Sequence, residues 1–281
     1  MSEKALTNRR IFKSCFLSLL LWITGCTSQE TLLSPTLEVA DDQLISHLTL
    51  PIVSGKHFQS KDTQSLQADD FANPGMLWVD KGLQLWETPP STLSPSCAKC
   101  HSNNLQFKTV ATRYPVYSSS KKRVINLEQR INQCREQQQM QPTWAYESQE
   151  LLSITAYIAN LSRGMPFSVT VNTQSLPFLL QGQDYYYTRR GQLNLACFHC
   201  HENYVGTQLR GDKLSQGHGN GYPAYRLEWQ TLGSLHRRLR ACDIGVRAEA
   251  YSLGSTEYVN LELYLAWRAQ NLTIETPAVR R

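Results

Sequence analysis

The sequence lacks both a strong excess of one charge and a long hydrophobic run. Its 281 residues carry a formal charge of only +5, and the first 25 residues hold four basic side chains against one acidic one. The remaining chain is therefore only mildly basic, which argues against a protein that binds nucleic acid. Apolar residues make up 41% and charged residues 18%, proportions typical of a globular protein with one large domain or two small ones.

The most hydrophobic segment, residues 15–23, is too short to span a bilayer of about 30 Å as a helix. It follows the basic segment 4–13 and ends in Ile-Thr-Gly-Cys at 23–26, an order that is typical of a secretory signal and resembles a bacterial lipobox. We therefore predict a lipoprotein-type signal peptide at 1–25, export to the periplasm and a lipid anchor on Cys26 that tethers the chain to a membrane. Plain signal cleavage nearby and an uncleaved anchor are the alternatives.

The rest of the chain consists of a polar segment and two halves that repeat. Residues 26–70 are rich in Ser, Thr, Gln and Asp, which predicts an arm with little core of its own. Gly82 and Gly182 each lie fifteen positions before a Cys-x-x-Cys-His motif, and the two motifs start 100 residues apart. A repeat of this length is typical of a duplicated domain. We expect one domain at 71–166 and the other at 167–281.

Both motifs, at 97–101 and 197–201, have the spacing of a covalent haem c site. Two cysteines three positions apart on a helical turn reach the two vinyl groups of one haem, and the next residue, His, faces the iron as proximal ligand. A zinc knuckle or a redox Cys-x-x-Cys is the alternative, but zinc needs further Cys or His ligands at suitable spacing. We therefore predict two haem c groups. The predicted attachment thiols are Cys97, Cys100, Cys197 and Cys200, and the predicted proximal ligands are His101 and His201.

The helical patterns favour one helix before each haem motif and one helix at the end of each half. Each half shows one pattern before its motif, at 82–87 and 181–192, and an amphipathic one at its end, at 150–159 and 257–266. Strand patterns are few. We therefore expect a mainly α fold of two tandem class I cytochrome c-like domains with long loops, related by internal duplication.

Methionine, a common sixth ligand of haem iron in class I cytochromes, is scarce. The chain has four, and none follows Met165, so no methionine is available in the second half. The candidates there are His218, His236 and Cys242, although His218 lies in a glycine-rich loop and is expected at the surface. Cys134 is the counterpart of Cys242 in the first half. This parallel placement predicts two thiolate axial ligands, and a disulfide between the two cysteines is the alternative.

These features resemble the SoxA family, the dihaem subunits of the SoxAX complex of bacterial thiosulfate oxidation. The resemblance covers roughly residues 70–270. Its most specific parts are residues 130–134, 197–201, 221–226 and 236–242. The resemblance implies that Cys134 ligates the first haem iron and that Cys242 ligates the second and can carry an extra sulfur as a persulfide. It also implies that Arg238 lines the active site.

The resemblance further implies an oxidoreductive sulfur transferase of the L-cysteine S-thiosulfotransferase type. Such an enzyme joins thiosulfate to a cysteine thiol of a SoxYZ-like carrier protein, passes electrons through haem to a downstream cytochrome c, and pairs with a SoxX-like monohaem subunit. Arg238 and Cys242 lie four positions apart, on one face of a helix. A guanidinium is suited to bidentate binding of sulfonate oxygens, so these two residues are the predicted catalytic pair.

Two other functions are compatible with two haems. A pure electron-transfer dihaem cytochrome has no need of a thiolate ligand beside anion-binding arginines. A thiosulfate dehydrogenase-like enzyme, which forms tetrathionate, usually has Met or Lys on its other haem. The lack of methionine after His201 and the presence of Cys134 argue against that second alternative.

Overall fold

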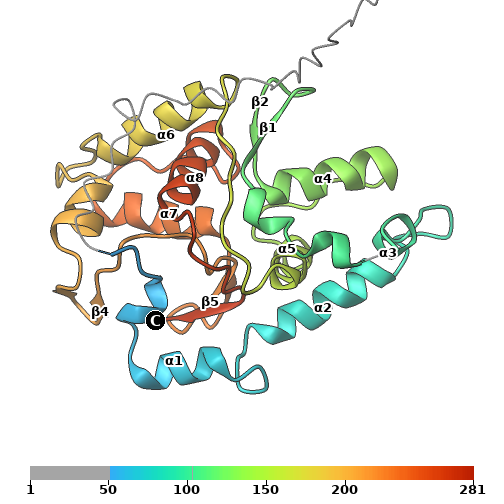
Figure 1. Cartoon of the computed structure of the whole chain (residues 1–281), viewed down its shortest axis with the longest axis horizontal. Helices are drawn as coiled ribbons and strands as arrows, with labels where there is room; N and C mark the ends of the chain where they lie inside the picture. The colour runs from blue at the N-terminus through green and yellow to red at the C-terminus, as the bar shows by residue number, and fades with distance from the viewer. Residues whose placement is uncertain (1–50, 103) are drawn as a thin grey trace, which may run out of the picture. The chain divides into compact units, whose positions relative to one another are not determined.

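The computed structural model describes residues 51–102 and 104–281. The signal peptide predicted at 1–25, the lipid site Cys26 and the first part of the predicted arm lie outside these residues. Within them, no helix is long and apolar enough to cross a membrane. The described part is mainly α-helical and contains three small sheets (Figure 1).

The first half is built on two crossing helices, α2 (Met76–Glu87) and α5 (Gln149–Leu161) (Figure 1). The helices can approach closely because Gly82 has no side chain. A Cβ at this position would come within 2.6 Å of the Cβ of Tyr157 on α5. The first haem motif forms the short helix α3 (Cys97–Cys100), which packs against α2.

The second half repeats this crossing with α6 (Leu176–Tyr187) and α8 (Thr256–Arg268). Gly182 takes the place of Gly82, since a Cβ on it would overlap the backbone of Asn260 on α8. The second haem motif continues into a π-helical turn, η5 (His199–Asn203). Corresponding glycines therefore permit the same helix crossing in both halves.

Between its two crossing helices, each half also has a β-hairpin that leads into a further helix. In the first half these are β1 (Val116–Ser118), β2 (Arg123–Ile125) and α4 (Leu127–Gln138). In the second half they are β5 (Ala224–Arg226), β6 (Thr231–Gly233) and α7 (Leu235–Gly245). Each of these elements starts 108 residues after its counterpart. The shorter elements are η3 (Asn104–Phe107), η4 (Ala111–Arg113), β3 (Gln208–Leu209) and β4 (Asp212–Lys213).

The hairpins join the two halves because each lies against the core of the other. Val124 of β2 is buried in the second-half cluster around α6 and α8. Leu232 of β6 is buried in the first-half cluster around α2 and α5. Tyr225 of β5 likewise meets Trp78 of α2, with ring centroids 5.9 Å apart. The boundary at 166/167 therefore does not divide two independent cores.

The segment before α2 is folded, so the prediction of an arm with little core is wrong for residues 51–70. Two helical segments, η2 (Gly55–Phe58) and α1 (Lys61–Ala68), pack on the C-terminal strand β7 (Ala278–Arg280). The amide oxygen of Gln67 accepts a hydrogen bond from the backbone N–H of Val279 at 3.2 Å. The physical reason is that polar residues such as Gln67 satisfy the free edge of β7, which a composition argument does not reveal.

The helices predicted at 150–159 and 257–266 are confirmed, each within a slightly longer element. The two predicted ahead of the motifs differ in extent. The first starts at Met76 instead of residue 82, and the second spans Leu176–Tyr187 instead of 181–192. It ends early because Thr188 is extended and the chain then forms an antiparallel bridge between Arg190 and Leu195.

Candidate functional site

The first haem motif presents a neutral imidazole among aromatic rings. N-cap Ser96 accepts a backbone hydrogen bond of 3.1 Å that starts α3, and His101 follows this helix directly. Trp86 stacks on the His101 ring with centroids 5.7 Å apart, and Phe107 meets it edge-on at 5.0 Å. Burial, with Arg130 nearby, lowers the pKa of His101. The ring is therefore neutral at pH 7, which is the form that binds metals.

The second haem motif holds its histidine more tightly. The Nδ1–H of His201 donates to the carbonyl oxygen of Ser215 at 2.7 Å, which leaves Nε2 free to bind iron. Burial lowers the pKa of His201 to about 4. The loop behind the ring requires glycine, because Gly217 has a φ of +77° and a Cβ on it would lie 2.9 Å from the His201 Cγ.

Two other histidines near this motif have protein partners. The Nδ1 of His199 accepts a hydrogen bond of 3.0 Å from the backbone of its own turn. His218 is buried, so the prediction of a surface position is wrong. Its Nε2 lies 3.2 Å from the amide oxygen of Gln216, and burial lowers its pKa to about 3. The reason is that segment 51–53 hydrogen-bonds to Gln216 and covers the loop.

Cys134 and Cys242 are free thiols, and each lies near the haem motif of its own half. Burial raises the pKa of Cys97, and the charge on Cys134 raises it further. Burial likewise raises the pKa of Cys197 to about 12. It also raises the pKa of Cys200. The charge on Cys242 raises the pKa of both thiols further. The alternative disulfide between Cys134 and Cys242 does not form. These electrostatic effects are consistent with one extra thiol near each motif.

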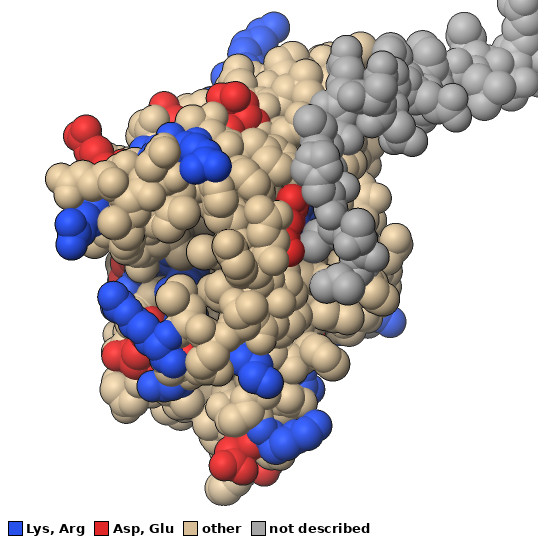
Figure 2. Space-filling view, turned by 90° about the vertical axis from the view of Figure 1, so that its left-hand side faces the viewer, with Lys and Arg blue, Asp and Glu red and all other residues tan. Residues whose placement is uncertain are grey.

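Arg238 lies one helical turn before Cys242 on α7 (Leu235–Gly245). The charge on Cys242 raises the pKa of Arg238, more than any other group near it. Among the residues that the structure describes, no ion pair or side-chain hydrogen bond engages this guanidinium. Figure 2 shows the side of the molecule where α6 and β4 lie, with a hollow bordered by Lys and Arg side chains. An anion that enters beside Cys242 can therefore pair with Arg238.

The neighbouring arginines of α7 have other partners. Arg237 lies 3.6 Å from a carboxylate oxygen of Glu147, and its guanidinium is stacked 4.3 Å from the centroid of the Trp229 ring. Arg240 donates to the backbone oxygen of Tyr251 at 3.2 Å. Of the three arginines on α7, Arg238 is therefore the one available for a small anion.

Sequence analysis did not single out Asp243, the residue after Cys242. Its carboxylate is buried and accepts hydrogen bonds from Tyr185, Tyr258 and Arg190. The one signal in the sequence is the acidic residue directly after the cysteine, where the first half has Arg135.

Both motifs have the features that a haem c group requires. The attachment cysteines are free, and each motif lies beside a buried aromatic residue whose polar atom has no hydrogen-bond partner among the described residues: Trp86 Nε1 and the Tyr186 hydroxyl. A buried donor without a partner is costly, and haem carboxylates are suitable acceptors. Within the described part, no three His, Cys, Asp or Glu side chains gather as ligands of a protein-bound ion. Haem iron needs only two protein ligands, because the porphyrin supplies four nitrogens.

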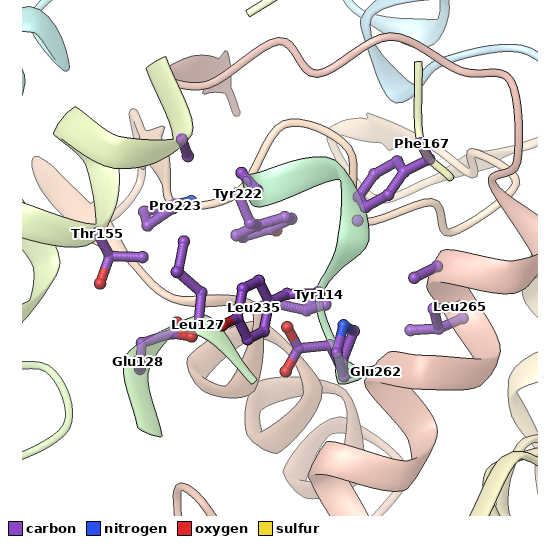
Figure 3. Close-up of a pocket in the computed structure, with 15 residues that line it drawn as sticks. Tyr114, Leu127, Glu128, Thr155, Phe167, Tyr222, Pro223, Leu235, Glu262 and Leu265 are labelled. Carbon is purple, nitrogen blue, oxygen red and sulfur yellow. The ribbon is translucent and has the colours of Figure 1, made fainter. Parts of the chain in front are cut away.

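A cavity of about 60 Å³ lies between the halves, away from the haem motifs (Figure 3). The carboxyl groups of Glu128 at the start of α4 and Glu262 on α8 both line it. His236 at the start of α7 accepts from the backbone N–H of Gly254 at Nδ1 and donates from Nε2 to Glu262 at 2.9 Å. This bond makes His236 a structural residue of the interface, and Cys242 remains the candidate ligand of the second half.

The buried carboxyl of Glu128 makes a pH-dependent contribution to stability. Burial, reinforced by the charge on Glu262, raises the pKa of Glu128 from 4.5 to about 7. The native state therefore keeps a proton that the unfolded chain releases, so the contribution of Glu128 to the free energy of unfolding falls as pH rises from 4.5 to 7. We expect Glu128→Gln to remove a decrease of about 3 kcal/mol in the free energy of unfolding between these pH values.

Denaturant titrations of the haem-loaded protein at several pH values across this window test the prediction. Glu136→Gln is the matched control, because Glu136 lies on the same helix and is exposed. It should leave the pH dependence unchanged. An unaltered pH dependence in Glu128→Gln would show that Glu128 carries no proton at neutral pH.

Comparison with known proteins identifies the family of the chain. The family model for the SoxA/TsdA cytochrome c domain matches residues 81–167, which include the first haem motif. A covalently bound haem c is therefore part of this chain. The L-cysteine S-thiosulfotransferase subunit SoxA of Rhodovulum sulfidophilum is 41% identical over 231 residues, which cover 82% of this chain and 80% of that protein. The same subunit of Pseudaminobacter salicylatoxidans is 39% identical, with 82% and 81% covered.

Comparison of the fold with solved structures agrees with the sequence comparisons. The crystal structure of SoxXA from P. pantotrophus contains a chain that superimposes with a TM-score of 0.79 at 34% identity. The match covers 82% of this chain and 87% of that chain. The sequence identities of 34–41% extend over most of each pair of chains, which is sufficient to assign a family. The chain belongs to the SoxA family.

Proposed function

We propose that the chain carries two haem c groups on two cytochrome c folds that arose by internal duplication. The repeated helix crossing at Gly82 and Gly182 supports this proposal, as does the 108-residue interval between the hairpins and helices of the two halves. The buried partnerless atoms of Trp86 and Tyr186, beside the two motifs, support it further. The haem-to-protein ratio tests it directly, with two per chain expected. A variant with Cys197 and Cys200 replaced by Ala should then retain one.

We propose that the chain, as a SoxA-type subunit, catalyses the oxidative conjugation of thiosulfate to a cysteine thiol of a SoxYZ-like carrier protein. The observation that carries this proposal is the placement of Arg238 one helical turn before Cys242 on α7, with no ion pair or side-chain hydrogen bond to its guanidinium among the described residues. Joining the sulfane sulfur of thiosulfate to a thiol forms one S–S bond and releases one proton and two electrons. Haem, when bound, supplies a centre that accepts electrons one at a time.

The residues around Cys242 have distinct roles in this reaction. Arg238 binds the sulfonate end of thiosulfate through charge-assisted hydrogen bonds and leaves its sulfane sulfur beside the Cys242 sulfur. Cys242 would hold the second haem iron, and its sulfur forms the transient S–S bond, with a persulfide as the alternative resting form. The hydrogen bond from His201 Nδ1 to the Ser215 oxygen orients His201, which would hold the same iron as proximal ligand. In the first half, His101 and Cys134 provide the corresponding pair.

One solved relative supports a proposal about a partner subunit. The solved neighbour is a SoxXA complex, and we propose that this chain likewise pairs with a SoxX-like monohaem cytochrome. Electrons then leave to a downstream cytochrome c. We place the reaction in the periplasm, with a lipid on Cys26 as the proposed tether.

A direct assay tests the function. The haem-loaded chain with its SoxX-like partner is mixed with thiosulfate, the carrier protein and an oxidised cytochrome c. Mass spectrometry of the carrier should show a thiosulfonate adduct on its cysteine, and two equivalents of cytochrome c should be reduced for each adduct. Reduction with no adduct and with tetrathionate as product would instead establish a thiosulfate dehydrogenase. If neither the carrier adduct nor tetrathionate forms, the chain is a pure electron-transfer protein.

A further inference from the structure

The carboxylate of Asp243 is the centre of a buried hydrogen-bond network directly after Cys242. Its Oδ2 accepts from the hydroxyl groups of Tyr185 and Tyr258, both at 2.7 Å. Its Oδ1 accepts from Arg190 at 3.0 Å. Asp243 itself is only 7% exposed. Three donors on one buried carboxylate hold it in a single position.

This network ties the helix of Cys242 to three other parts of the second half. Tyr185 lies on α6, Tyr258 lies on α8, and Arg190 belongs to the loop that leads into the haem motif. The guanidinium of Arg190 also stacks on the rings of Tyr185 and Tyr251, at 4.6 and 4.8 Å from their centroids. The end of α7 is therefore fastened to the same frame that carries the haem cysteines.

The backbone strengthens the same connection. Gln192 and Leu193 of the loop donate to the carbonyl oxygens of Arg247 and Val246 after α7, at 3.2 and 3.3 Å. The loop enters the haem motif at Cys197 only a few residues later. The position of Cys242 relative to the motif is thus set by side-chain and backbone contacts together.

The first half has no such carboxylate. Arg135 occupies the position that corresponds to Asp243, one residue after Cys134. Its guanidinium donates to the backbone oxygen of Pro142 at 2.7 Å and stacks 3.9 Å from the centroid of the Trp144 ring. Both partners belong to the loop that follows α4. The end of α4 is tied to the first motif by Gln139 instead, whose amide donates to the Pro95 oxygen at 3.0 Å and to the Cys97 sulfur at 3.7 Å. The first half therefore fastens its helix through a neutral side chain and not through a buried carboxylate.

We propose that Asp243 is a positioning residue that holds the Cys242 sulfur against the second haem motif and so makes this site, and not the Cys134 site, the place of sulfur chemistry. The first clause concerns the structure of the second haem site alone. The second rests on the proposed function.

Asp243→Asn in the haem-loaded complex tests the proposal, because Asn keeps the volume but loses the charge and one acceptor oxygen. We expect the electron paramagnetic resonance signal of the second haem to shift or split while that of the first haem stays unchanged. The turnover number for conjugation should fall about 10- to 100-fold. The KM for thiosulfate should change little, since Arg238 remains. Tyr258→Phe removes a single donor and should give a smaller change of the same kind.

Arg135→Ala is the matched control and should leave the second haem signal unaltered. An unchanged second haem signal in Asp243→Asn would overturn the proposal, as would equal changes in both haem signals, which mark a general loss of structure. A shifted second signal in a protein whose wild type forms no adduct would support the positioning role and refute the proposed function, so the two failures are distinguishable.

Discussion

Replacing Cys242 with Met is expected to abolish conjugation of thiosulfate to the carrier, with a loss of at least about 1,000-fold in turnover. Methionine can still ligate iron through its thioether, so the second haem keeps a sulfur ligand. It has no thiol, however, and cannot form an S–S bond. The adduct on the carrier cysteine, followed by mass spectrometry over time, is the measurement.

Cys134→Met is the matched control for this variant, because Cys134 has the same place in the first half. It should change the spectrum and potential of the first haem and retain adduct formation. Adduct formation that survives in Cys242→Met would contradict the catalytic assignment. A loss in Cys134→Met as large as that in Cys242→Met would refute the assignment of sulfur chemistry to the second site.

Replacing Arg238 with Ala is expected to lower kcat/KM for thiosulfate by about 100-fold, since two hydrogen bonds to a charged group are lost at about 1.5 kcal/mol each. Most of the loss should appear in KM, because the guanidinium binds the sulfonate and not the reacting sulfur. Arg238→Lys keeps the charge but not the bidentate geometry, so its loss should be intermediate. Initial rates over a range of thiosulfate concentrations measure both effects.

Arg237→Ala is the control for charge on the same helix. Its guanidinium is engaged by Glu147 and Trp229, so kcat/KM should change by less than about 3-fold, as expected for a rim charge. Similar losses in Arg237→Ala and Arg238→Ala would indicate general attraction of an anion by a basic surface. The specific role of Arg238 in binding would then be wrong.

Local spacing made the two haem motifs recognisable in the sequence. The attachment residues at 97–101 and 197–201 act within one helical turn, so no distant contact is needed to recognise them. The terminal helices at 150–159 and 257–266 were predictable for a related reason: each has a continuous apolar face, which is visible in a short window. The parallel positions of Cys134 and Cys242 also follow from the sequence alone.

Features that depend on distant contacts were not predictable. The polar segment that contains Gln67 is folded because Gln67 accepts a hydrogen bond from a backbone N–H of β7, more than 200 residues away in sequence. His218 looks like a surface residue until segment 51–53 covers its loop. The sequence around Val124 does not reveal that this residue is buried against the core of the second half.

The same division holds at the candidate site around Cys242. Amino-acid order alone establishes that a cysteine and three arginines share α7, because helical spacing is a local property. Only the tertiary structure decides among those arginines: it engages Arg237 and Arg240 with partners from other segments and leaves Arg238 beside Cys242. Asp243 acquires its role in the same way, since Tyr185, Tyr258 and Arg190 meet it only once α6, α7 and α8 have packed.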